Sequence, residues 1–249
     1  MTASLKRALE ILKEDGSKTL AKKSLTYVIR FLHSPHFLLK VGSVGRGKSL
    51  ENLVDFTMKG CYGLISPFQD KKEILGLIKL LDKFKPRTLI EIGTASGGTL
   101  FLFSRIASDD ATLVSVDLPY GKFGGGYPNW KIPIYKSFAL KNQKIHLIRE
   151  NSHDVKTFGK VKNILGGRKA DFIFIDGDHT YEGAKRDFEL YRHLLKKGGV
   201  LGLHDIVPHT KESGCDVFRF WNEIKKKYKH KEIVNGWNKQ MGGIGLLFL

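Results

Sequence analysis

The sequence predicts an α/β fold in which helices cover both faces of a mostly parallel sheet, preceded by amphipathic helices at the N-terminus. Three observations lead to this prediction. Short, continuously apolar runs recur beyond residue 85, helical patterns separate several of them, and the 249-residue chain is 41% hydrophobic, which suffices for a substantial core. Strands that are apolar throughout are typical of parallel sheets buried on both faces.

The predicted strands and helices alternate along this part of the chain. The strands are residues 87–92, 112–117, 144–149, 171–176, 199–205 and 244–249. The helical patterns before and between them include residues 71–84, 100–106 and 182–195. Because parallel neighbours need a long crossover, this alternation favours parallel pairing over hairpins.

Residues 1–50 are predicted to form a basic helical arm, and residues 51–249 the main domain. Apolar residues stand at helical spacing in two stretches of the arm, Leu5, Ala8, Leu9 and Leu12, then Leu25, Val28, Ile29 and Leu32. The pattern breaks near Gly16, and His33-Ser34-Pro35 is expected to end the second helix. The glycines and cations of residues 42–48 are typical of a linker.

The chain is strongly basic, with 42 Lys and Arg against 25 Asp and Glu and a formal net charge of +17. Residues 1–50 contribute ten cations and three acids to this excess. Such charge predicts attraction to an anionic membrane surface, nucleic acid or a phosphorylated substrate. The apolar stripes of the arm favour the membrane, and packing of the stripes on the main domain or in a homo-oligomer is the alternative. Few aromatic residues separate the cations, which disfavours nucleic acid.

The expected location is the cytoplasm, with the arm peripheral on the inner membrane face if it binds lipid. No apolar run is long enough to span a bilayer, and the first thirty residues lack the pattern of a signal peptide. The two cysteines, Cys61 and Cys215, have no CxxC spacing, so the sequence favours free thiols over a disulfide or structural zinc.

Acidic residues stand at the carboxyl ends of the predicted strands. These are Glu91, Asp117, Glu150, Asp176 and Asp205. Open parallel sheets bind ligands in the crevice at these ends, and burial of apolar surface does not require an acid there. The sequence therefore places the functional site at this edge of the sheet.

The first strand runs into a glycine-rich loop with the features of an adenosine site. Gly93 and Gly97 permit a tight turn and close approach of a ligand, and a helix is predicted to start near Gly98. Asp117 follows at a distance suited to accept the ribose hydroxyls. The candidate cofactor-binding residues here are Glu91, Gly93, Thr94, Ala95, Ser96, Gly97 and Asp117, and Asp176 after the fourth predicted strand is a further candidate.

Three interpretations of this loop remain open on its residues alone. Residues 93–98 also match a degenerate dinucleotide-binding GxGxxG pattern, and a tight turn without a ligand is the third interpretation. A carboxylate at Glu91 suits a ligand with a cationic amino-acid portion and opposes a pyrophosphate. The loop therefore favours S-adenosylmethionine (SAM) as the cofactor.

Several segments together resemble a known family. They are Asp117-Leu118-Pro119, the stretches 123–128 and 174–183, Lys197-Gly198-Gly199, His204-Asp205-Ile206 and Phe220-Trp221. From about residue 60 to the C-terminus the chain is similar to class I SAM-dependent methyltransferases of the Methyltransf_24 type, related to metal-dependent macrolide-sugar O-methyltransferases and to a cephalosporin-pathway enzyme. The resemblance implies a Rossmann-like, doubly wound, seven-stranded sheet. It also implies SAM as the methyl donor.

Asp176-Gly177-Asp178-His179 places an imidazole and two carboxylates where an acceptor hydroxyl would lose its proton. The resemblance implies that Asp176 binds Mg²⁺ and that His179 is the general base. It also places Ser152 near the adenine, with a helix cap as the alternative role. Structural hydrogen bonds to strand-end carbonyls are the alternative for His179 and His204.

The fifth strand departs from the pattern of these relatives, which have an acidic pair where this chain has His204-Asp205. An imidazole suits zinc, iron or manganese better than Mg²⁺. Asp176, His204 and Asp205 are therefore candidate ligands of Mg²⁺ or another divalent metal, without a choice between them. The glycine- and aromatic-rich residues 123–130 are a candidate lid or an ordinary loop.

The sequence thus favours an O-methyltransferase acting on a sugar or other small-molecule hydroxyl, in polysaccharide or glycolipid synthesis. Two alternatives remain. A nucleic-acid methyltransferase would suit the charge, but the chain lacks the Asn/Asp-Pro-Pro-Tyr/Phe type of motif used for base amino groups. A non-catalytic adaptor would keep the cofactor site without turnover.

Overall fold

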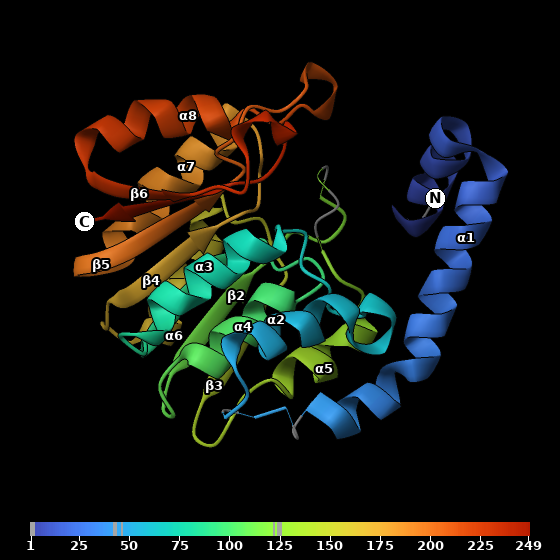
Figure 1. Cartoon of the computed structure of the whole chain (residues 1–249), viewed down its shortest axis with the longest axis horizontal. Helices are drawn as coiled ribbons and strands as arrows, with labels where there is room; N and C mark the ends of the chain where they lie inside the picture. Colours follow the sequence, from blue (N-terminus) through green and yellow to red (C-terminus); the bar gives the residue numbers. More distant parts are fainter. Residues whose placement is uncertain (1–2, 42–43, 46, 122, 124–125) are drawn as a thin grey trace.

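A computed structural model describes residues 3–41, 44–45, 47–121, 123 and 126–249 (Figure 1). Its centre is a seven-stranded sheet with the order β3-β2-β1-β4-β5-β7-β6. The strands are β1 (Thr88–Ile92), β2 (Thr112–Val116), β3 (Lys144–Ile148), β4 (Ala170–Ile175), β5 (Leu195–His204), β6 (Lys229–Ile233) and β7 (Ile244–Phe248). β1 to β5 are parallel, and β7 runs antiparallel between β5 and β6. The predicted Rossmann-like fold is confirmed.

Helices pack on both faces of this sheet (Figure 1). They are α1 (Ala3–Val41), α2 (Leu50–Lys59), α3 (Lys71–Asp82), α4 (Gly98–Ile106), α5 (Ile132–Lys136), α6 (Val155–Leu165), α7 (Tyr181–Tyr191) and α8 (Val217–Ile224). Alternate residues of each strand face opposite layers. In β1, Leu89 belongs to the apolar core shared with α2 to α5, whereas Ile90 belongs to the core shared with α6, α7 and α8.

The site lies where the strand order changes direction, between β1 and β4. Chain connections leave these two strands toward opposite sides of the sheet, which opens a crevice at their carboxyl ends. The strands approach closely there. A Cβ on Gly93, just after β1, would lie 1.9 Å from the carbonyl oxygen of Asp176, just after β4. Glycine is therefore required at this position.

The arm differs from expectation at Pro35. The predicted break near Gly16 is present as a kink (φ 80°), but α1 continues through Pro35 to Val41 instead of ending there. The prediction of a helix end at His33-Ser34-Pro35 is wrong. Phe37 and Val41 are buried in the core with α2 and α4, and this burial offsets the hydrogen bond that the proline removes. The division between arm and domain at residue 50 stays a prediction.

Among the described residues, no helix is long and apolar enough to cross a membrane. Most of α1 stands away from the sheet at one side of the molecule (Figure 1). Its nearest contacts with the domain include Tyr27 and Phe31, whose rings meet Trp130 edge to face. The Trp130 indole N–H also donates to the Tyr27 hydroxyl at 2.7 Å.

Candidate active site

Two adjoining cavities open at the carboxyl ends of the central strands. The first, about 190 Å³, is lined by residues that follow β1 to β4, including Asp117 and Ser152. The second, about 400 Å³, is lined by residues that include Asp176, His179 and Asp205. Four residues line both cavities, Gly93, Asp117, Phe123 and Gly177. A ligand bound in the first cavity could therefore extend past Gly93 into the second cavity.

The loop after β1 is held in one shape by contacts from both sides. The Ala95 N–H donates to Oδ2 of Asp117 at 2.8 Å, and the Ala95 carbonyl accepts from the Tyr135 hydroxyl at 2.8 Å. Gly97 has φ 88°, and a Cβ there would lie 2.5 Å from the Tyr135 ring. The backbone of Gly93 and Ala95 consequently faces the second cavity.

The other predicted loop residues lie beneath this surface and line neither cavity. Glu91 and Thr94 are buried, with Glu91 accepting from the Thr99 hydroxyl and Thr94 paired with the Ser115 hydroxyl. Ser96 is half-buried. Burial raises the pKa of Glu91 to about 8, so this carboxyl is protonated at neutral pH.

Asp117 and Ser152 do reach the first cavity. The Asp117 carboxylate accepts from Ala95 N–H and from Gly126 N–H, the latter at 3.0 Å on Oδ1. Burial raises the pKa of Asp117 to about 6, against these hydrogen bonds that lower it, and the group stays mostly ionised at pH 7. Ser152 is not the cap of α6, because Asp154 occupies the N-cap position. Its predicted place beside an adenine stays a prediction.

Two aspartates and three histidines meet in the second cavity. Oδ1 of Asp176 lies 3.0 Å from Nδ1 of His204 and 3.4 Å from Nε2 of His179. Its other oxygen, Oδ2, accepts from the Gln69 side-chain amide at 2.5 Å. Both histidines therefore bond aspartate side chains, and the alternative role of pairing with strand-end carbonyls does not describe them.

Asp205 forms the opposite side of this cluster. Its Oδ2 lies 3.0 Å from Nδ1 of His179, while Oδ1 lies 3.2 Å from Nε2 of His209 and accepts from the Gly242 N–H at 3.2 Å. The backbone of Asp205 has φ 61°, a left-handed conformation that costs free energy in most non-glycine residues. Such strain is retained where the surrounding contacts fix the residue.

The histidines are held in a strongly anionic setting. Burial lowers the pKa of His179, but hydrogen bonds with Asp176 and Asp205 outweigh burial and raise it well above its ordinary value. A hydrogen bond with Asp205 raises the pKa of His209 to about 10. Burial raises the pKa of the Cys215 thiol, but its hydrogen bonds with His179 and His209 lower it overall.

A protein-family model described as a methyltransferase domain matches residues 90–206. This range includes every residue that lines the first cavity and, from the second, Asp176, His179, His204 and Asp205. The resemblance to methyltransferases of this type that the sequence predicts is thereby confirmed over residues 90–206.

Comparisons with known proteins place the methyltransferase domain among distant relatives. The uncharacterised protein y4gI of Sinorhizobium fredii is 29% identical over 172 residues, and protein R132 of Acanthamoeba polyphaga mimivirus is 32% identical over 118 residues. These matches cover 65% and 47% of this chain but 18% and 51% of the relatives. The chain therefore spans about half or less of the length of these relatives.

Solved structures share the fold at low identity. An O-methyltransferase from Bacillus cereus in complex with SAH has a TM-score of 0.55 and 18% identity, over 84% of this chain and 95% of that one. The O-methyltransferase TomG from Streptomyces achromogenes, in complex with SAM, has a TM-score of 0.54 and 15% identity, over 82% and 92%. These likenesses support the architecture of the methyltransferase domain.

Three residues of the site were not predicted from the sequence, namely Gln69, His209 and Cys215. Phe123 was predicted only as part of a candidate lid. Phe123 stacks on the His179 imidazole, with ring centroids 4.8 Å apart and planes at 9°, and fixes its orientation. Gly124 and Gly125 of the candidate lid lie outside the described residues. Asp205 and His209 are four residues apart, a spacing that was a weak indication in the sequence that their side chains could meet.

Proposed function

We propose that the methyltransferase domain transfers a methyl group from SAM to a hydroxyl of a small molecule or glycan. The observation that carries this proposal is the pair of adjoining cavities. One presents Asp117, an acceptor for ribose hydroxyls, and the other presents a cluster of imidazoles and carboxylates. The two O-methyltransferases with the same fold, solved with SAM and SAH, support this choice.

In this proposal the first cavity receives the adenosine. The Asp117 carboxylate accepts from the ribose hydroxyls through lone pairs not used by Ala95 and Gly126, and Ser152 lies beside the base. Gly93 allows the ligand to pass between the cavities at the level of the backbone. When bound, SAM supplies the electrophilic methyl group.

The acceptor occupies the second cavity. Its hydroxyl oxygen forms a bond to the methyl carbon while the carbon–sulfur bond breaks, and the electron pair of that bond stays on the sulfur. The hydroxyl proton passes to the neutral form of His179, the proposed general base, whose ring is oriented by Phe123 and by the two aspartates. Because Asp176 and Asp205 stabilise the protonated imidazole and so raise its pKa, turnover is expected to increase with pH. The cavity walls position the reacting oxygen in line with the methyl group.

The donor atoms around this cavity do not fit Mg²⁺. That ion requires an octahedral set of oxygen ligands, and the cluster offers two carboxylates among three imidazoles and a thiol. Asp176, His204 and Asp205 do offer ligand atoms within 4.8 Å of one another, a mixed set better suited to a transition metal. No step of the proposed reaction depends on Mg²⁺.

Calorimetry with S-adenosylhomocysteine (SAH), the product of methyl transfer, tests the first step. The expected result is binding to the wild-type chain that is weakened in the Asp117→Asn variant. Absence of binding would reject the proposal. Transfer of labelled methyl from SAM to a panel of sugars, sugar nucleotides and phenols then tests the acceptor class. Cofactor binding without turnover on any acceptor would support the adaptor alternative.

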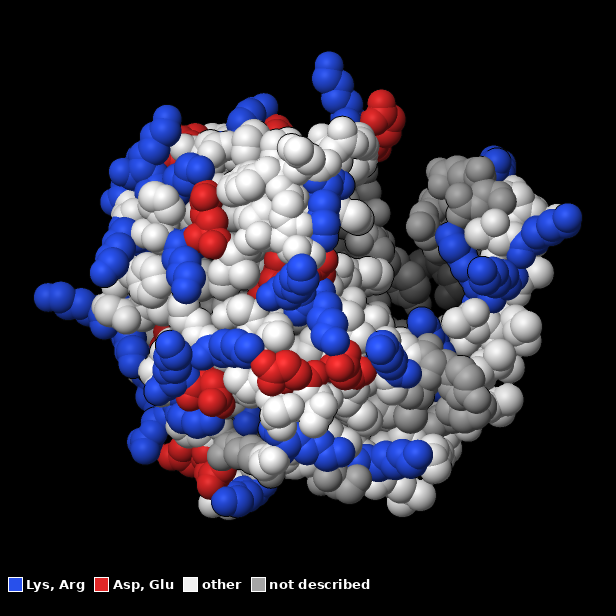
Figure 2. All heavy atoms as spheres, viewed as in Figure 1, with Lys and Arg blue, Asp and Glu red and all other residues white. Residues whose placement is uncertain are grey.

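We also propose that α1 contacts an anionic membrane surface. Leu25, Val28 and Leu32 stand on one face of α1 and are 62%, 49% and 67% exposed. Lysines lie along the same helix, and Figure 2 shows basic side chains there and over the adjacent face of the domain. Apolar groups for the interface and cations for head groups are the features of peripheral helices.

Co-sedimentation with vesicles tests this second proposal. Binding is expected to vesicles that contain phosphatidylserine and to decrease in the Leu25→Glu/Leu32→Glu variant, with Leu118→Glu, an exposed leucine of the domain, as the matched control. Equal binding to neutral vesicles would contradict the electrostatic contribution. A stable dimer in solution that the arm variant abolishes would instead show that a second copy covers the stripe.

A further inference from the structure

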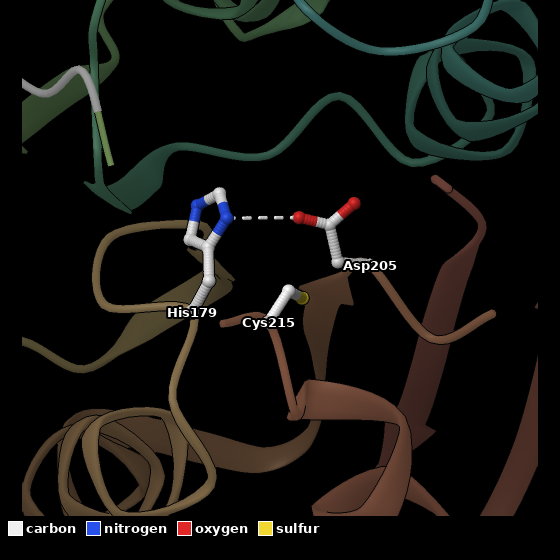
Figure 3. A group of neighbouring side chains, drawn as sticks. All are labelled: His179, Asp205 and Cys215. Atoms are coloured by element: carbon white, nitrogen blue, oxygen red, sulfur yellow. Dashed lines mark ion pairs between the residues drawn. The ribbon is translucent and has the colours of Figure 1, made fainter. Parts of the chain in front are cut away.

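A cysteine thiol beside the cluster has no part in the proposed methyl transfer. Cys215 lies in the loop before α8, two residues from its first residue Val217, and its thiol is directed to the side of the cluster formed by Asp205. One ligand atom each of His179, Asp205 and Cys215 lie within 4.8 Å of one another. Figure 3 shows the imidazole and the carboxylate facing each other with the cysteine beside them.

We propose that His179, Asp205 and Cys215 form a binding site for a zinc-class transition metal ion. Imidazole nitrogen, carboxylate oxygen and thiolate sulfur are the ligands that zinc accepts in proteins, and a thiolate selects against Mg²⁺. Three protein ligands leave one position of a tetrahedral ion open, as in catalytic zinc sites. His179 and Asp205 line the second cavity, so the site adjoins the proposed place of the acceptor.

The Asp205 carboxylate is held in position for a metal ion by its other contacts. Oδ1 of Asp205 accepts from the Gly242 N–H at 3.2 Å and lies 3.2 Å from Nε2 of His209. The His209 ring is itself anchored, because its Nδ1 lies 2.8 Å from the Val207 carbonyl oxygen. These contacts fix the orientation of the carboxylate and leave Oδ2 toward His179. In metal sites, hydrogen bonds from neighbouring residues to the ligating side chains fix the orientation of those side chains.

The site brings together three segments that are separate in the sequence. His179 follows β4, Asp205 follows β5, and Cys215 precedes α8. The strained backbone of Asp205, with φ 61°, is retained at the point where these segments meet. Both proposals use His179, so a bound metal ion competes with its role as general base, but the metal test is separate because it uses neither SAM nor an acceptor. A failure of one proposal leaves the other standing.

Cobalt titration tests the proposal directly. Co²⁺ added to the metal-stripped full chain is expected to bind one ion per chain and to give a thiolate-to-cobalt charge-transfer band in the near ultraviolet, which Zn²⁺ removes by competition. Cys215→Ser is expected to lose this band and to weaken Zn²⁺ binding on the order of 100-fold. Cys61→Ser, which replaces the other cysteine of the chain, is expected to keep both.

A charge-transfer band that persists in Cys215→Ser would overturn the proposal, as would Zn²⁺ binding of unchanged affinity in that variant. The second result would assign the metal to Asp176, His204 and Asp205 instead. A measurement on the wild-type chain covers the case in which the variant fails to fold. Zn²⁺ is expected to slow alkylation of Cys215 by iodoacetamide at least about 10-fold by mass spectrometry. Equal rates with and without Zn²⁺ would reject the site.

Discussion

Replacing Glu91 by glutamine removes a titratable group beneath the cofactor loop without changing its shape. Glu91 is 2% exposed, and Oε2 of its carboxyl has no hydrogen-bond partner among the described residues. Burial raises the pKa of Glu91 from 4.5 to about 8, although hydrogen bonds from Thr99 and Thr94 oppose the change. At neutral pH the group is therefore a neutral acid, which an amide imitates closely.

The size of the effect follows from this difference in pKa. One pKa unit corresponds to about 1.4 kcal/mol, so a rise from 4.5 to about 8 amounts to about 5 kcal/mol between the extremes of pH. The folded chain binds a proton that the unfolded chain has released, so the free energy of unfolding falls as pH rises from 4.5 to 8. Between pH 5 and pH 8 the loss is about 3 kcal/mol.

Urea unfolding followed by circular dichroism at several pH values measures this slope. The difference between wild type and Glu91→Gln is expected to grow in favour of the variant by about 3 kcal/mol from pH 5 to pH 8. Glu51→Gln, an exposed glutamate paired with Lys79, is the control and is expected to follow the wild type. A variant at Glu91 with the same pH slope as the wild type would refute the reasoning. Unchanged SAH affinity in this variant would place Glu91 outside the cofactor contacts.

Three further predictions concern the site. Gly93→Ala is expected to weaken SAH binding more than about 10-fold or to prevent folding, because the new Cβ would lie 1.9 Å from a carbonyl oxygen. Gly159→Ala is the control, because its Cβ would have nothing within 4 Å. This control is expected to keep the calorimetric SAH affinity and the melting temperature at or above those of the wild type. Asp117→Asn is expected to weaken SAH binding about 10-fold through loss of charge-assisted hydrogen bonds, and equal affinity would contradict the ribose contact. His179→Ala is expected to reduce turnover by at least about 100-fold while SAH affinity stays within a few fold, and unchanged turnover would remove His179 from the mechanism.

The central sheet could be predicted because its strands are mostly apolar, with only isolated polar residues. β1, β2 and β4 were expected to within one residue at each end, since burial on both faces keeps polar residues few within each run. β6 (Lys229–Ile233) was not recognised as a strand, because its charged residues are largely exposed and only pairing with β7 makes it one. The continuation of α1 past Pro35 also depends on tertiary burial that local sequence does not encode.

The site residues that the sequence predicted are those that directly follow strands. Asp117, Asp176 and Asp205 follow strands, and parallel register alone brings them to one edge. Gln69, His209 and Cys215 stand in loops whose course depends on packing elsewhere. Neither the hydrophobic periodicity nor the residue spacing of the sequence therefore predicted their positions. Cys215 was expected to be an ordinary free thiol, and its position beside His179 gives it a chemical setting that the sequence did not indicate.

The cofactor loop and the His–Asp cluster are joined through a contact made of two backbone hydrogen bonds. Gly93 donates to the Val116 carbonyl and Asp176 donates to the Ile92 carbonyl, both at 2.8 Å, which holds the ends of β1, β2 and β4 together. The Asp176 side chain thereby enters the second cavity at the place where Gly93 faces both. Backbone changes at this contact must disturb cofactor and acceptor together, whereas side-chain changes in the cluster act on the acceptor alone. Comparing Gly93→Ala with His179→Ala therefore distinguishes a shared framework from two independent sites.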